Sequence, residues 1–263
     1  MNSFEEILYM LQDKMETPVA WGKFHLMCIG ISALVLILLT LKKKHSEVEL
    51  KLVLATYGII ALALEIGKQL IWSINYDAVN NIITWDYQWY AAPFQLCTTP
   101  IFVSLICLFL KDGKTRNSLL SYLVFVTIWG GLLTVIIPDS CFTDDTLINI
   151  HTMWLHCGSL VLSLYLIMSE NVKVEKQDMI DGFKVFLVFA LLAEILNITV
   201  YNMDVLNGEE FNMFYISPYF VSSLPVFKVL QERLPFFAYL FIYIFAVFIG
   251  ANVIYYFFRK RKV

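Results

Sequence analysis

The chain has 263 residues, of which 59% are hydrophobic and 16% are charged. A soluble domain carries about 25% charged residues, so the composition excludes the ordinary soluble classes and predicts a membrane protein. The net charge of −3 is small, and the basic residues gather in short segments between apolar ones, so we expect no nucleic-acid partner.

Seven apolar segments of 17 to 23 residues follow one another along the chain. Each is long enough to cross a hydrocarbon core of about 30 Å as a helix rising about 1.5 Å per residue. Backbone polar groups in lipid must be bonded within their own segment, which favours helices over isolated strands. We therefore predict an all-α fold, a polytopic transmembrane helix bundle forming one domain over 1–263, with spans at about 24–41, 52–74, 94–110, 119–137, 147–168, 183–201 and 236–258.

Two segments outside the spans are also partly apolar. Residues 1–20 have apolar side chains at helical spacing but no basic start and no continuous apolar core, so we predict an outer amphipathic segment rather than a cleavable signal. The connection 202–235 is rich in aromatic residues and is broken by Pro218 and Pro225. This pattern suits a short interfacial or re-entrant element on the outer side.

Basic residues are concentrated on one side of the predicted membrane. With seven spans, the connections 42–51, 111–116 and 173–184 lie on the same side as the tail 259–262, and together they hold 14 of the 19 Lys and Arg residues. Because positive residues stay on the cytoplasmic side, we predict a multi-pass cell-membrane protein with its N-terminus outside and its C-terminus in the cytoplasm.

Polar side chains within the predicted spans fall at one depth. Because successive spans alternate in direction, five of them bring such groups to the outer half of the bundle. Ionisable groups in hydrocarbon cost at least ~2.5 kcal/mol each, so they should face one another rather than lipid. We therefore predict a polar pocket in the outer half, formed by His25, Glu65, Lys68, Gln95, Cys97, His151, His156, Glu194, Asn197 and Tyr201.

Residue spacing favours ion pairing over metal binding. Glu65 and Lys68 lie three residues apart on one helix face, where they can pair. His151 and His156 are five residues apart, which places them about 140° apart around a helix. They therefore cannot bind one ion from adjacent turns, as a pair four residues apart does. We predict no metal site, and nothing in the sequence indicates another cofactor.

Cys97 has the surroundings of a reactive thiol. Pro93 suits the first turn of its helix, where a missing N–H costs nothing. Cys97 would then lie about one turn inside, near the positive end of the helix dipole, which favours the thiolate. Pro100 removes an N–H and is expected to kink the helix beside the sulfur. A histidine at the same depth, His151 or His156, would act as the base of a Cys–His pair.

Each of these residues also has a structural alternative. A buried free cysteine such as Cys97 can act as a small hydrophobic residue. The pair of Glu65 and Lys68 would equally hold helices in register. His156 would then bond a neighbouring helix, and His25, at a span end, suits the membrane interface. The convergence of five helices on one depth supports a site more strongly than any single residue does.

The same residues resemble the YwaF family of bacterial integral membrane proteins. The family's aromatic-Gly-x-Phe-His-Leu start is matched by Trp-Gly-Lys-Phe-His-Leu at 21–26, and its Leu-Pro-Leu-His-Leu-Cys motif by Ala-Pro-Phe-Gln-Leu-Cys at 92–97. The likeness covers nearly the whole chain. Its further matches are the acidic–basic pair Glu65 and Lys68, the histidine-bearing fifth span, Asn197 and the stretch Asn212-Met213-Phe214-Tyr215.

That family is similar to a eukaryotic membrane cysteine acyltransferase, which moves fatty acyl chains between phospholipids. The resemblance implies that Cys97 is the nucleophile, that His151 or His156 is the base, and that membrane phospholipids are the partners. The chain departs from the motif at Gln95, where the family has histidine. An amide accepts no proton at neutral pH, but it can position an acyl carbonyl as a hydrogen-bond donor.

Two other functions fit the same sequence. A small-solute or ion carrier would use the polar pocket as its transport site, although the chain has no repeated half and its polar residues favour one leaflet over the midplane. A non-catalytic membrane scaffold or sensor would use the outer connections to contact a partner. The sequence does not indicate an oligomeric state.

Overall fold

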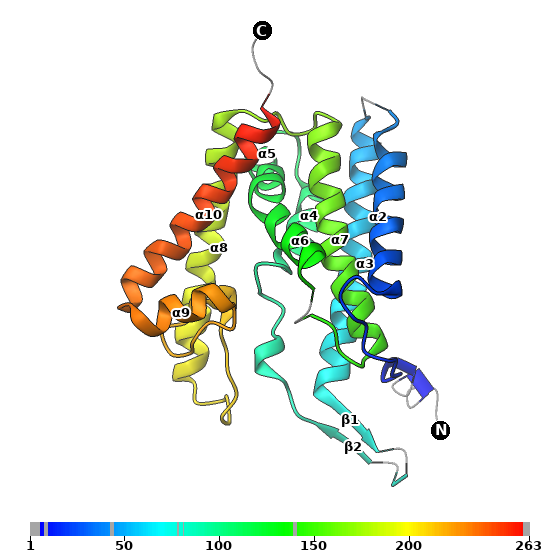
Figure 1. Ribbon diagram of the computed structural model, residues 1–263, viewed down its shortest axis with the longest axis vertical. Coiled ribbons are helices and arrows are strands. Elements are labelled where there is room, and N and C mark those ends of the chain that lie inside the picture. Colours follow the sequence, from blue (N-terminus) through cyan, green and yellow to red (C-terminus); the bar gives the residue numbers. More distant parts are fainter. Residues whose placement is uncertain are drawn as a thin grey trace.

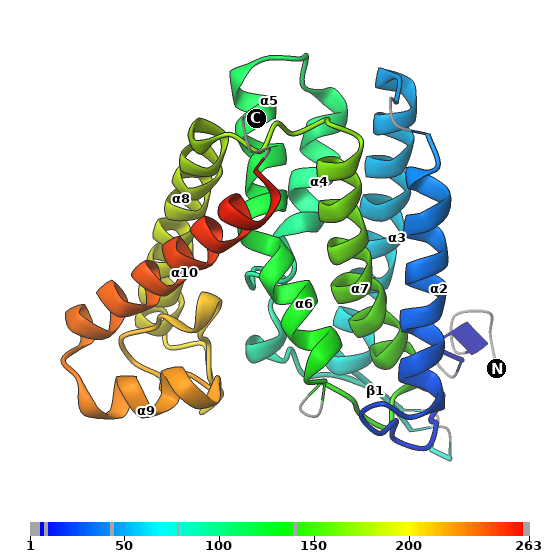
Figure 2. The ribbon, with the colours of Figure 1, turned by 45° about the horizontal axis from the view of Figure 1, so that its top comes forward.

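The computed structural model describes residues 6–7, 10–42, 45–77, 79–80, 82–138 and 141–259. These residues form an all-α bundle (Figures 1 and 2). Within them, six helices are long and apolar enough to cross a membrane, which confirms the predicted polytopic bundle. They are α2 (Lys23–Thr40), α3 (Glu47–Ser73), the continuous helix Lys114–Ile136, α7 (Thr146–Met168), α8 (Lys176–Asn202) and α10 (Phe236–Phe258).

The predicted span 94–110 is helical over only part of its length. Its helix, α4 (Thr99–Phe109), has 11 residues and is about 16 Å long, too short to cross the hydrocarbon core. Residues 92 to 95 form irregular backbone and residues 96 to 98 a turn instead. The third predicted span is therefore a short buried helix preceded by irregular backbone, which membrane proteins tolerate where it is covered by protein or faces a cavity.

Two proline predictions for this segment were wrong. Pro93 does not begin the helix, and Cys97 precedes α4 rather than lying one turn inside it. Pro100 occupies the first turn of α4, where its missing N–H costs nothing, so it begins the helix without kinking it. The carbonyl of Leu96, which Pro100 leaves without a helical donor, accepts the hydroxyl of Thr99 at 2.8 Å.

A π-helical turn interrupts the central membrane helix. The helix consists of α5 (Lys114–Tyr122), the π turn η2 (Leu123–Thr127) and α6 (Ile128–Ile136). The carbonyl of Leu123 accepts the hydroxyls of Thr127 at 2.9 Å and of Ser163 at 2.6 Å, which supply bonds where the regular helical ladder is broken. Because η2 contacts α7, α8 and α10, it lies at the centre of the bundle.

Smaller elements gather at one end of the bundle. Here α3 continues into an antiparallel hairpin of β1 (Ile74–Asp77) and β2 (Ile82–Trp85), and the 3-10 turn η1 (Trp89–Ala91) follows. The connection from α8 to α10 adds the 3-10 turn η3 (Met213–Tyr215) and α9 (Pro225–Arg233) at the same end (Figure 1). Irregular backbone is thus concentrated around the hairpin end.

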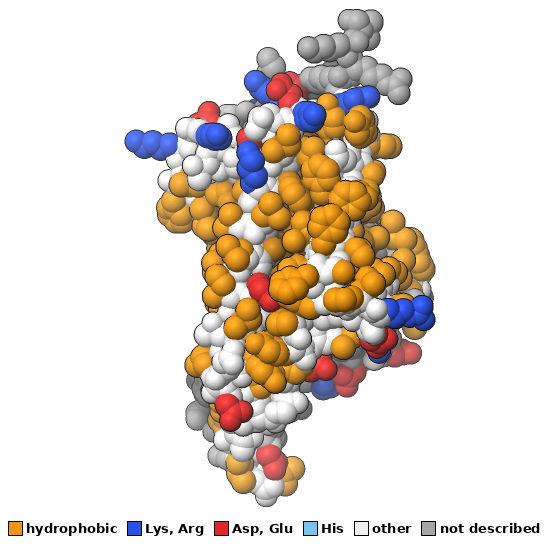
Figure 3. All heavy atoms as spheres, turned by 90° about the vertical axis from the view of Figure 1, so that its left-hand side faces the viewer, with side chains coloured by type: hydrophobic (Ala, Val, Ile, Leu, Met, Phe, Trp, Pro, Cys, Tyr) orange, Lys and Arg blue, Asp and Glu red, His pale blue; other side chains and the backbone are white. Residues whose placement is uncertain are grey.

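The opposite end of the bundle carries the basic connections. The connections from α2 to α3, from α4 to α5 and from α7 to α8 lie there with the end of α10 (Figure 1). Figure 3 shows an apolar band across the face formed by α8, α9 and α10, with Lys and Arg side chains gathered above it. These connections therefore share one face, as the alternating spans predict.

The amphipathic segment predicted at 1–20 lies partly outside the described residues. Within the described part, Lys14 pairs with Asp145 at 2.6 Å between Nζ and the carboxylate. The N–H of Met15 donates to the carbonyl of Asp144 at 2.8 Å. These contacts hold the N-terminal segment against the connection that precedes α7.

Candidate active site

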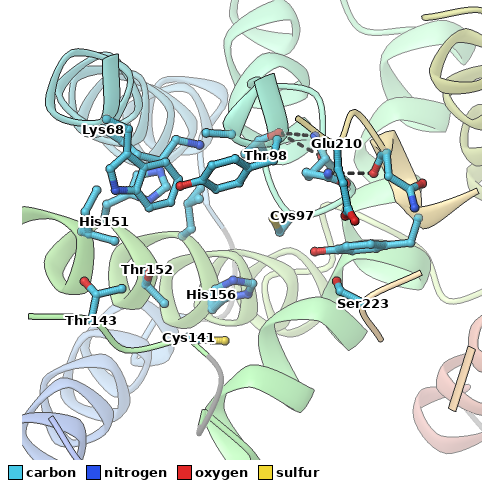
Figure 4. A pocket seen from close by; sticks show the side chains of 18 of the residues that line it. Lys68, Cys97, Thr98, Cys141, Thr143, His151, Thr152, His156, Glu210 and Ser223 are labelled. Atoms are coloured by element: carbon cyan, nitrogen blue, oxygen red, sulfur yellow. Dashed lines mark hydrogen bonds between the residues drawn. The ribbon is translucent and has the colours of Figure 1, made fainter. Parts of the chain in front are cut away.

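A cavity of about 470 Å³ opens near the hairpin end of the bundle (Figure 4). Its walls come from α3, the turns before α4, α7 with the segment that precedes it, and the connection between α8 and α9. The cavity brings together half of the ten predicted pocket residues. They are Lys68, Gln95, Cys97, His151 and His156.

Cys97 lies in the turn that leads into α4. The hydroxyl of Thr98 donates to the carbonyl of Gln95 at 2.9 Å and accepts the N–H of Gln95 at 3.0 Å. The same carbonyl accepts the N–H groups of Thr98 and Thr99 at 3.0 and 3.2 Å. These bonds fix the turn, which presents the half-buried Cys97 side chain to the cavity directly before the first turn of α4.

Glu65 connects α3 to α7 beside the cavity. One carboxylate oxygen pairs with Nζ of Lys68 at 2.7 Å and the other with Nε2 of His151 at 2.8 Å, and all three side chains are buried. Gln69 donates to the same carboxylate at 2.9 Å and to the carbonyl of Ala91 at 2.6 Å. Buried charges are tolerated when they are paired and further hydrogen-bonded. The network therefore holds α3, α7 and the turns before α4 together around the cavity.

His156 projects from α7 into the cavity (Figure 4). Its Nδ1 lies 3.2 Å from the carbonyl oxygen of Gly130 on α6. A carbonyl only accepts hydrogen bonds, so Nδ1 of the neutral ring carries the proton and Nε2 keeps its lone pair. The contact thus selects the tautomer that a general base requires. His151 differs, because its Nε2 is occupied by Glu65.

Gln95 and Asn197 hold one stretch of backbone from two sides. The Gln95 amide accepts the N–H of Phe214 at 2.9 Å and donates to the carbonyl of Asn212 at 3.0 Å. The Asn197 amide, on α8, accepts the N–H of Met213 at 2.7 Å and donates to its carbonyl at 3.1 Å. Both ends of each amide are therefore used to hold the backbone of residues 212–215, called below the 212–215 turn.

A comparison with known families adds one finding. The sequence model of the TMEM164 family matches residues 20–255. The chain belongs to the TMEM164 family. That match spans every residue that lines the cavity, and the family is one of multi-pass membrane proteins, in agreement with the long apolar helices. No curated protein and no solved structure matches the chain.

The expectation that all ten polar residues converge on one pocket was wrong for this TMEM164-family chain. His25 is fully buried near the start of α2, where Nδ1 accepts the N–H of Trp21 at 3.0 Å. Tyr201 is 44% exposed and stacks on Tyr219, with ring centroids 3.7 Å apart. Depth along a helix does not determine the direction in which a side chain points. The residues that do not line the cavity are His25, Glu65, Glu194, Asn197 and Tyr201.

The cavity also includes residues that the sequence did not predict for the site. Tyr215 and Ser223 reach it from the connection between α8 and α9, and Trp72 and Tyr90 from the hairpin end. The sequence placed Tyr215 in the aromatic-rich connection 202–235 and in the stretch that resembles the YwaF family, but not in the pocket. Among the described residues, no three His, Cys, Asp or Glu side chains are grouped so that they could hold a metal ion.

Proposed function

We propose that this protein is a membrane cysteine acyltransferase that moves fatty acyl chains between phospholipids. The observation that carries the proposal is that Cys97 and His156 come from separate elements and line the same cavity. The position of Cys97 before α4 and the tautomer of His156 suit a nucleophile and its base. The resemblance of residues 92–97 to the YwaF motif supports the same cysteine.

The first half-reaction acylates Cys97. Nε2 of His156 removes the thiol proton, and the thiolate sulfur attacks the ester carbonyl carbon of a phospholipid. The tetrahedral intermediate collapses when the carbon–oxygen bond of the ester breaks. The departing alkoxide of the lysophospholipid takes the proton from the His156 imidazolium, and the acyl chain remains on Cys97 as a thioester.

The second half-reaction returns the enzyme to its starting state. The hydroxyl of a second lysophospholipid gives its proton to His156 and attacks the thioester carbonyl. The carbon–sulfur bond breaks, and the Cys97 thiolate recovers the proton from the imidazolium. No oxidant, reductant or energy source is consumed, because one ester is exchanged for another.

We assign the base to His156 rather than to His151. The carboxylate of Glu65 holds His151 and Lys68 together, so these three residues act as a positioning network between α3 and α7. Nδ1 of His156 bonds a neutral carbonyl, that of Gly130, which leaves Nε2 as the acceptor. The departure from the motif at Gln95 is then no obstacle, because the Gln95 amide is used to hold the 212–215 turn.

We also propose that the cavity lies on the outer side of the membrane, with the N-terminus outside. The basic connections lie at the end of the bundle opposite to the hairpin, and positive residues remain in the cytoplasm. The phospholipid substrate would then come from the outer leaflet.

The test is acyl transfer from liposomes of phosphatidylcholine that carries a labelled acyl chain. Wild-type protein should acquire label that hydroxylamine releases, and Cys97→Ala should acquire none. Cys28→Ala is the matched control, because Cys28 is a half-buried cysteine on α2 that does not line the cavity. His156→Ala should slow labelling by about 10²–10⁴-fold. Equal labelling of wild type and Cys97→Ala would leave Cys97 with a packing role only.

A further inference from the structure

Two successive aromatic residues, Phe214 and Tyr215, have left-handed backbone conformations, with φ values of 58° and 59°. Residues other than glycine rarely adopt this region, and bulky side chains make it costly. Such conformations persist only where the surrounding structure enforces them, and they concentrate at functional sites. The 212–215 turn is therefore held in a conformation that its own residues do not prefer.

Contacts from several sides enforce this conformation in addition to Gln95 and Asn197. The amide of Asn212 donates to the carbonyl of Phe220 at 3.1 Å and accepts the N–H of Ser217 at 2.9 Å. The hydroxyl of Tyr239, on α10, donates to the carbonyl of Tyr215 at 2.6 Å. The turn before α4, α8 and α10 thus bond the same four residues, which fixes the direction of the Cα–Cβ bond of Tyr215.

That direction brings the Tyr215 side chain into the cavity that Cys97 lines. Tyr215 lies in the connection after α8, outside the membrane-spanning helices. Burial, together with the negative charge of a Cys97 thiolate, raises the pKa of Tyr215 to about 12. The phenol therefore keeps its proton after the thiol has lost its own, and it remains a hydrogen-bond donor at neutral pH.

A donor of this kind is needed because attack on an ester creates a negatively charged oxygen. Backbone N–H groups beside the nucleophile often stabilise it. Here the two N–H groups that follow Cys97, those of Thr98 and Thr99, are already bonded to the carbonyl of Gln95. These two N–H groups are therefore not available to the oxyanion, and a side-chain donor from another element can take their place.

We propose that Tyr215 is a catalytic residue that donates its phenol hydrogen to the oxyanion formed when Cys97 attacks the acyl carbonyl. This inference rests on the proposed acyltransferase function and adds a residue to it. The O–H bond is not broken: the phenol stabilises the tetrahedral intermediate and the two flanking transition states by a hydrogen bond alone. The strained 212–215 turn then serves to hold this donor in place before substrate binds.

The test compares two reactions of the same sulfur in the purified full-length protein. Acylation of Cys97 by p-nitrophenyl butyrate passes through an oxyanion, whereas alkylation by iodoacetamide does not. Both rates are read by mass spectrometry of the peptide that contains Cys97. The variant is Tyr215→Phe, which loses one oxygen, and the control is Tyr219→Phe, which alters an exposed tyrosine of the same connection that does not line the cavity.

Tyr215→Phe should acylate about 10²–10³-fold more slowly than wild type and should alkylate at the wild-type rate. Tyr219→Phe should match wild type in both reactions. Acylation of Tyr215→Phe at the wild-type rate would overturn the role of Tyr215 alone. A parallel fall of both rates would also overturn it, because Tyr215 would then act on the thiol or its access. A wild-type protein that is alkylated but never acylated would overturn the acyltransferase proposal itself.

Discussion

Gly131 on α6 lies directly against the backbone of His156 on α7. A Cβ atom added at Gly131 would be 2.6 Å from the carbonyl oxygen of His156, a separation that real Cβ atoms do not show. The side chain of His156 bonds the carbonyl of Gly130, the residue before Gly131. The separation of α6 and α7 is therefore set at the position of the proposed base.

Gly131→Ala should consequently move α6 away from α7 and displace His156. Overpacking of this kind costs about 1–3 kcal/mol, and the rate of Cys97 acylation should fall with it. Gly130→Ala is the matched control, since nothing lies within 4 Å of a Cβ added there. Thermal unfolding in detergent and the labelling of Cys97 measure the two effects. If the two alanine variants have the same stability and the same rate of Cys97 labelling, the close approach of α6 and α7 does not affect the site.

The Glu65–Lys68 pair should show energetic coupling. Lys68→Met leaves the Glu65 carboxylate with less compensation in a buried setting, so unfolding should become easier by about 3–5 kcal/mol. Adding Glu65→Gln should recover part of that loss, because the buried charge is removed. Lys184→Met, which breaks an exposed pair with Asp181, should change stability by less than about 1 kcal/mol. Additive losses in the double-mutant cycle would contradict the coupling.

Local spacing was sufficient to predict the Glu65–Lys68 pair and the membrane helices. Residues three apart on a helix share a face, and the length of an apolar segment follows from the thickness of the bilayer. The alternating directions of the spans also placed His151 at the depth of Glu65. Its bond to Glu65 also depends on how α7 is rotated against α3, which spacing within one helix does not determine.

The features of the site that the sequence did not predict depend on contacts between distant segments. The turn at Cys97 is apolar enough to suggest helix, yet the Gln95 amide is engaged with residues 212 and 214, more than a hundred positions away. Tyr215, which lines the cavity, has a positive φ that no local preference favours. His25 and Tyr201 had the right depth but point elsewhere.

Loss of the ion pair between Lys14 and Asp145 should loosen the N-terminal segment at high pH. Hydrogen bonding to Asp145 raises the pKa of Lys14 above its usual 10.5. The contact therefore contributes fully below about pH 10.5 and is lost as the pH rises through the raised value. A spin label at the exposed position 10 should be immobile at pH 7 and mobile near pH 12. Lys14→Met should be mobile at both, and a label unaffected by pH in wild type would contradict the contact.

The topology predicts opposite accessibility for positions 114 and 144. Lys114 begins α5 at the basic end, and Asp144 precedes α7 near the hairpin end. In a background without the five native cysteines, a membrane-impermeant maleimide added to intact cells should label cysteine at 144 and not at 114. Permeabilised cells should show both. Labelling of both positions in intact cells would place the two connections on one side.

Gln95→Leu should reproduce the effect of losing the Tyr215 hydroxyl without altering Tyr215. Leucine fills a similar volume but leaves the N–H of Phe214 and the carbonyl of Asn212 without the amide, at a cost of about 1–3 kcal/mol for each group that stays buried and unpaired. The left-handed turn should relax, and the phenol should leave its position. We expect slower acylation of Cys97 by p-nitrophenyl butyrate and an unchanged rate of alkylation by iodoacetamide. Gln88→Leu, whose amide donates to Asp86 two residues away and does not line the cavity, should leave both rates unchanged. Normal acylation in Gln95→Leu would mean that the amide holds the fold but not the donor.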